Sequence, residues 1–164
     1  MDSRGHGKSD GHIYTLGIRE ADDISCLMDD MTERFPDHSF GIYARGNISS
    51  IALRAMERDK RIRYVVVENH YLEPKVELAS IFYYDDILFS SDFVERNLLK
   101  EVLQCLGVDQ SALEVDYTKI DQSVLILSTD YNHEAMSSLH TELGSKNKIL
   151  RLGKDNDFLR LGYG

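Results

Sequence analysis

The first residues of the chain hold its densest group of glycines and polar side chains, the string DSRGHGKSDG at positions 2–11. Three glycines permit a tight turn there, and Asp2, Arg4 and Ser9 can fix such a turn by hydrogen bonds. A glycine-rich loop could also cradle a phosphate. However, this string follows no predicted strand and matches neither G-x-G-x-x-G nor the Walker pattern, so it does not indicate nucleotide binding.

Two pairs of histidines have side chains of the type that binds metals. His6 and His12 lie near aspartates in the opening loop, and His133 and His140 are seven residues apart on a predicted helix. The loop spacing is flexible, and no cysteine or third histidine accompanies the second pair. We therefore predict loop and surface roles for these histidines, with no metal and no cofactor.

Charge and composition narrow the class of protein. The chain has 164 residues, with 19 Lys and Arg against 28 Asp and Glu, and its net charge of −9 argues against binding to nucleic acid or to an anionic membrane. No apolar run approaches the roughly 20 residues that cross a bilayer, and the polar N-terminus is unlike a signal peptide. We expect a cytoplasmic protein in which Cys26 and Cys105 are buried and unpaired.

Apolar periodicity predicts alternating helices and strands up to residue 68. A helix with one apolar face runs from Glu20 to Phe35 and ends at Pro36. The strand FGIYA at 40–44, a helix at 48–60 and the strand RYVVVE at 63–68 then form a βαβ unit, whose two strands are parallel.

The later part of the chain continues the alternation after a less regular stretch. Residues 70–122 are predicted to leave the sheet and to include a helix at about 91–106. A strand at 123–128, a helix at 134–143 closed by Gly144, and a candidate strand at 148–152 follow. The chain therefore belongs to the α/β class.

Several of these segments resemble the α/β-hydrolase superfamily. The opening string is similar to its D-x-R-G-x-G-x-S loop, and Thr15, Gly17, Glu20 and Asp23 match the t-x-G-x-x-E-x-x-D pattern of bacterial esterase-like and serine-aminopeptidase-like members. The segment GIYARGNISSIALRAMERDKRIRYVVVE resembles the strand, nucleophile elbow, helix and next strand of the same superfamily.

The resemblance covers residues 2 to about 68 and, more loosely, residue 123 to the end. It implies a single domain over residues 1–164 with a partial α/β-hydrolase-like fold. A short, mostly parallel sheet is flanked by helices, and a small cap insertion spans about 70–122. The family's activity is hydrolysis of esters, thioesters or amides by a Ser-His-Asp triad.

The residues at the positions of that triad differ from the family pattern. Gly46 stands where the nucleophilic serine is expected, and glycine has no side chain that could form an acyl intermediate. Asp130 is the candidate acid, although it could equally cap the following helix, and Asp155 occupies the position of the histidine. Ser49 and Ser50 are alternative nucleophiles, but the first turn of a helix favours a capping or packing role for them.

The resemblance also begins after a strand that this sequence does not contain. The strand at 40–44 would then be an open, apolar edge, which invites pairing with another chain. A second copy or a different chain covers this edge, or the chain reorganises, or the sequence is a piece of a longer protein.

We therefore predict a protein of hydrolase lineage without Ser-His-Asp activity in this chain, acting as a binding or assembly module with a small acyl molecule as a conceivable ligand. The alternative is an active esterase or peptidase-like hydrolase with a displaced nucleophile, Ser49 or Ser50, and a base among His6, His12 and His70.

Overall fold

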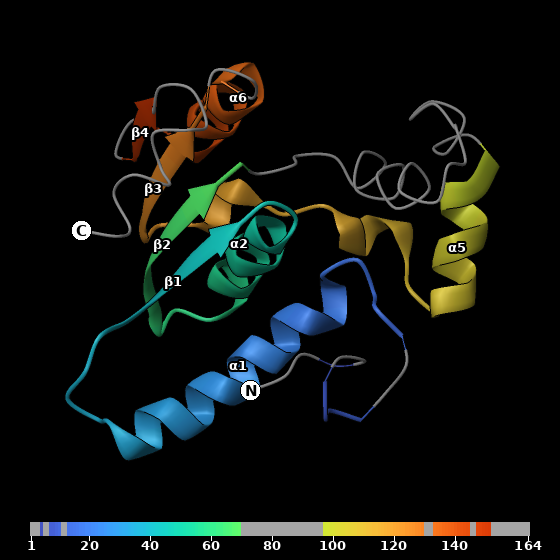
Figure 1. Cartoon of the computed structure of the whole chain (residues 1–164), viewed down its shortest axis with the longest axis horizontal. Coiled ribbons are helices and arrows are strands. Elements are labelled where there is room, and N and C mark those ends of the chain that lie inside the picture. The colour runs from blue at the N-terminus through green and yellow to red at the C-terminus, as the bar shows by residue number, and fades with distance from the viewer. Residues whose placement is uncertain are drawn as a thin grey trace.

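The structure is a computed structural model that describes residues 4, 7–10, 13–69, 97–129, 133–144 and 147–151. Helices and strands alternate along most of the chain (Figure 1). In chain order the elements are α1 (Ile18–Arg34), β1 (Phe40–Arg45), α2 (Ile48–Arg58), β2 (Ile62–Glu68), α5 (Leu99–Leu106), the 3-10 turns η2 (Gln110–Leu113) and η3 (Tyr117–Lys119), β3 (Ser123–Ser128), α6 (His133–Leu143) and β4 (Lys148–Arg151).

The strands form one parallel sheet in the order β1-β2-β3-β4. This confirms the predicted α/β class and the parallel pairing of the βαβ unit. β3 has the predicted bounds, and each of the other strands differs from its own predicted range by one residue at one end. Of the helix predicted at 91–106, the structure shows Leu99–Leu106, and residues 91–96 lie outside the described ranges. Because the strands are parallel, their carboxyl ends meet at one edge of the sheet.

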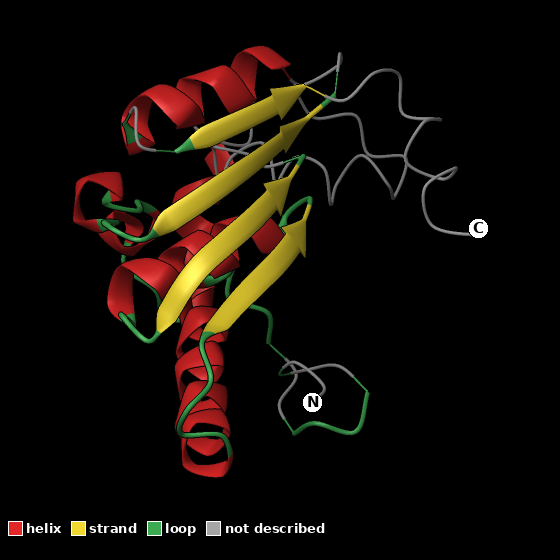
Figure 2. Cartoon of the chain, turned by 90° about the vertical axis from the view of Figure 1, so that its left-hand side faces the viewer, coloured by secondary structure: helices red, strands yellow, loops and turns green. Residues whose placement is uncertain are grey.

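In the described part of the chain, helices cover one face of the sheet. α2 packs against β1 and β2, and α6 packs against β3 and β4; both lie on the same side (Figure 2). The core between them includes Leu53, Met56, Val65 and Ile126, all fully buried. The opposite face presents three large apolar side chains that are about half exposed, namely Tyr43 (60%), Tyr64 (48%) and Leu150 (52%).

A second, smaller core holds α5 against the start of α1. It contains Leu16, Leu99, Leu103 and Leu113. Arg54, which is buried on α2, donates hydrogen bonds to the backbone carbonyls at the end of η2, including that of Leu113 at 2.7 Å. The segment between β2 and β3 is thus tied back to the central helix where it returns to the sheet.

Buried Glu20 determines where α1 begins. Its carboxylate accepts hydrogen bonds from the backbone N–H and the hydroxyl of Thr15, at 2.9 and 2.7 Å, and from the N–H of Gly17 at 2.9 Å. Gly17 has a φ of 85°, which favours glycine. The helix consequently starts at Ile18, two residues before the predicted start.

The expectation that both cysteines are buried is wrong. Cys26 and Cys105 are free and exposed. Each lies two positions from a buried helix residue, Met28 for Cys26 and Leu103 for Cys105. Two positions correspond to about 200° around an α-helix, so apolar neighbours in the sequence do not place these thiols in the core.

None of the described helices has the length and apolar character needed to cross a membrane.

We predict that Glu20→Gln lowers the free energy of unfolding by about 1–3 kcal/mol, because the amide nitrogen cannot accept the bonds that a carboxylate oxygen accepts. Urea unfolding of both proteins measures the difference. Glu33→Gln is the control, since Glu33 is exposed and its loss should change stability by less than about 0.5 kcal/mol. Equal losses in the two variants would contradict the role of Glu20.

We predict that Asp59, a mostly buried residue between α2 and β2, stabilises the folded state in a pH-dependent way. Arg61 binds its carboxylate at 2.6 Å and also reaches Asp29 on α1 at 2.7 Å. These hydrogen bonds from Arg61 lower the pKa of Asp59. The stabilisation is therefore present above the unfolded value of about 4 and is lost as the pH falls through the lower folded pKa. In urea unfolding, Asp59→Asn should destabilise the protein at neutral pH, and the difference from the natural chain should shrink as the pH falls below about 4. An equal loss of stability at neutral and at acidic pH would contradict this role of Asp59.

Candidate functional site

The turn between β1 and α2 lies at the carboxyl edge of the sheet and has Gly46 at its apex. Gly46 has a φ of 62°, and no described atom lies within 4 Å of the position that a Cβ would occupy. Its N–H donates to the carbonyl of Glu68 at 2.7 Å, and its carbonyl accepts from the N–H of Ser49 at 3.0 Å. The turn is thus sharp and open above its apex, but glycine supplies no nucleophile there.

The two serines that follow the turn both donate to backbone carbonyls. Ser49 is fully buried, and its hydroxyl lies 3.1 Å from the carbonyl oxygen of Ala44 and 3.3 Å from that of Glu68. The Ser50 hydroxyl donates to the carbonyl of Asn47 at 2.7 Å. The described hydrogen bonds of these serines run to carbonyls and not from helix N–H groups, so neither serine caps the helix. Ser49 joins α2 to the ends of β1 and β2, and Ser50 bonds to the residue before α2. Both hydroxyls are therefore engaged in bonds to backbone carbonyls.

A carboxylate that the sequence interpretation did not single out lies beside the turn. Glu68 ends β2 and is only 2% exposed. Its carboxylate accepts a hydrogen bond from the Tyr43 hydroxyl and forms an ion pair with Arg45, at 3.2 Å from Nε. Tyr43 and Arg45 are two residues apart on β1, and Arg45 is the register partner of Glu68, so all three side chains lie on the sheet face without described helices. In the sequence, Glu68 was marked only as a charged residue at the end of an apolar strand, which does not predict this cluster.

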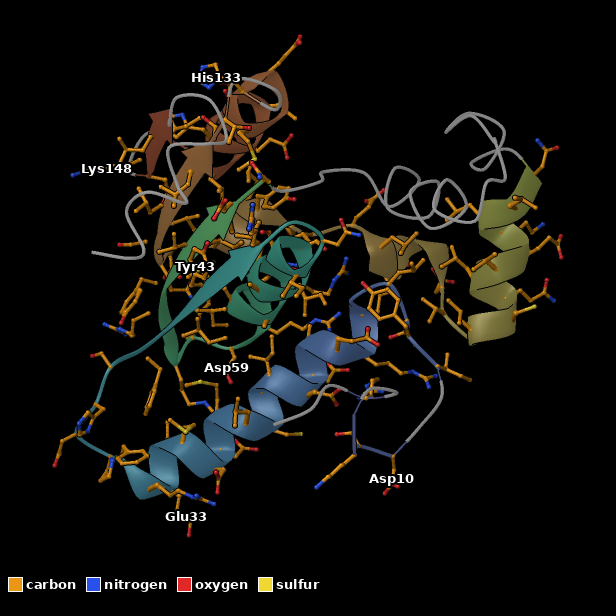
Figure 3. The ribbon with its side chains drawn as sticks, viewed as in Figure 1. Asp10, Glu33, Tyr43, Asp59, His133 and Lys148 are labelled. Carbon is orange, nitrogen blue, oxygen red and sulfur yellow. The ribbon has the colours of Figure 1, made fainter. Side chains whose placement is uncertain are left out.

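A serine and a histidine meet at the end of β3. The Ser128 hydroxyl lies 3.0 Å from Nδ1 of His133, the first residue of α6. Ser128 is fully buried, so this hydroxyl has no access to a substrate as the structure stands. The contact between Ser128 and His133 anchors the start of α6. It lies well away from the Glu68 cluster, as the separate positions of His133 and Tyr43 show (Figure 3). His133, predicted as a surface histidine, is partly exposed. Its contact with Ser128 joins residues of two elements and carries no signal in the sequence.

The remaining predicted site residues lie outside the described ranges. These are Asp130, the candidate acid, Asp155 at the histidine position, and the candidate bases His6, His12 and His70. Within the described residues, no group of three histidine, cysteine or carboxylate side chains is arranged to hold a metal ion.

A cavity of about 660 Å³ lies near the amino end of β3, away from the Gly46 turn. Four carboxylates contribute to its lining, those of Glu57, Glu114, Asp116 and Glu142. Burial, followed by the nearby charge of Glu142, raises the pKa of Tyr117 in this lining to about 12. Lys119 neutralises part of the acidic charge through ion pairs with Asp116 at 3.0 Å and Glu57 at 3.6 Å. The cavity therefore belongs to the packing of η3 and not to the turn.

We predict that Tyr43 titrates above the usual phenol value of about 10. Its hydrogen bond to Glu68 is the main cause of the raised pKa, because ionisation of the phenol would remove the donated proton and place two negative charges side by side. Glu68→Gln should move the pKa back toward 10 in an ultraviolet titration. The part of the ultraviolet titration that disappears in Tyr43→Phe belongs to Tyr43. A Tyr43 titration that is unchanged in Glu68→Gln would disprove the contact between Tyr43 and Glu68.

Among known proteins, some solved structures have a fold similar to that of this chain, but their sequences are only distantly similar. No family model matches the sequence, and no curated protein matches it significantly. Among solved structures, an esterase from Pyrococcus furiosus aligns with a TM-score of 0.62 at 15% identity, over 97% of this chain and 62% of the esterase. Acetyl xylan esterase 1 from Thermoanaerobacterium aligns with a TM-score of 0.55 at 17% identity, over 98% of this chain and 63% of that enzyme.

A peptidase also has a similar fold. Acylaminoacyl peptidase from Pyrococcus horikoshii aligns with a TM-score of 0.56 at 13% identity, over 85% of this chain and 24% of the peptidase. This chain thus spans less than two thirds of each of these three proteins. At these identities the similarity concerns the fold, and this chain has part of the fold of the esterase, lipase-like and peptidase α/β hydrolases.

Proposed function

We propose that this chain is a protein of hydrolase lineage that has no serine-based acyl transfer and acts as a binding or assembly module. The observation that carries the proposal is the turn at Gly46. Its positive φ and the open space above it are the features that would present a nucleophile at a strand-to-helix turn. A glycine at this apex keeps the turn and leaves out the reacting group.

The geometry of the nearby serines also supports the proposal. A displaced nucleophile needs a hydroxyl that reaches a substrate and donates its proton to a base. Ser49 is buried and its hydroxyl bonds to carbonyls at the ends of β1 and β2, and the Ser50 hydroxyl donates to the carbonyl of Asn47, so both hydroxyls are already engaged. The alternative of an active hydrolase that uses either serine would require this turn of α2 to open.

Exposed apolar surface supports the role of a binding module. Tyr43, Tyr64 and Leu150 lie on the sheet face opposite α2 and α6, as their register on β1, β2 and β4 requires. Large apolar side chains gathered on one face are typical of an interaction surface. A partner that covers this face would bury them, whereas acyl chemistry would need the missing nucleophile.

We expect that a fluorophosphonate probe modifies no serine of the purified chain, as mapped by mass spectrometry, and that ester turnover equals that of a Gly46→Ala variant. Ser49→Ala and Ser50→Ala serve as matched variants, and an active serine esterase shows that the probe is competent. Labelling at Ser49, Ser50 or Ser128 that disappears in the corresponding alanine variant would overturn the proposal and favour the displaced-nucleophile hydrolase.

A further inference from the structure

We draw no further inference here: the strongest candidate, the apolar patch that Tyr43, Tyr64 and Leu150 form on the sheet face opposite α2 and α6, carries none, because nothing in the described part of the structure shows what covers it.

Discussion

The burial of α2 is the constraint on which the rest of the structure depends. This helix packs against α1, β1 and β2, and most of its side chains are inaccessible to water. A helix in that position must satisfy its polar groups internally, because an unmet buried donor or acceptor is costly. Ser49 does so through the carbonyls of Ala44 and Glu68, and the two terminal nitrogens of Arg54 do so through the carbonyls at the end of η2.

The same constraint maintains the sharp turn at Gly46 in the absence of a nucleophile. β1 must enter the sheet next to β2, and α2 must return directly beneath it, so the two residues between them have little freedom. The bond from the Gly46 N–H to the Glu68 carbonyl extends the pairing of the strands into the turn. Packing thus determines the shape of the turn, whereas its chemistry depends on one side chain. A chain can therefore share the fold of esterases and peptidases while lacking a serine at this position.

The exposed apolar side chains of Tyr43, Tyr64 and Leu150 have a structural origin in the sheet. A parallel sheet is normally covered on both faces and continued at its edges. In the described part of this chain, helices cover one face of the sheet, and β1 pairs with a strand on one side only. The aligned esterases are longer than this chain, which spans 62% and 63% of them.

The sequence by itself determined the α/β class, the boundaries of the strands to within one residue and the glycine at the β1–α2 turn, because apolar periodicity and glycine act over a few neighbouring residues. It could not determine the Glu68–Tyr43–Arg45 cluster or the Ser128–His133 contact, which join residues on different elements. It also misplaced Cys26 and Cys105, since only the packing of each helix decided which of its sides faced water. Local patterns specify the elements, whereas the positions of side chains between elements arise only when the chain packs and each buried polar group must find a partner.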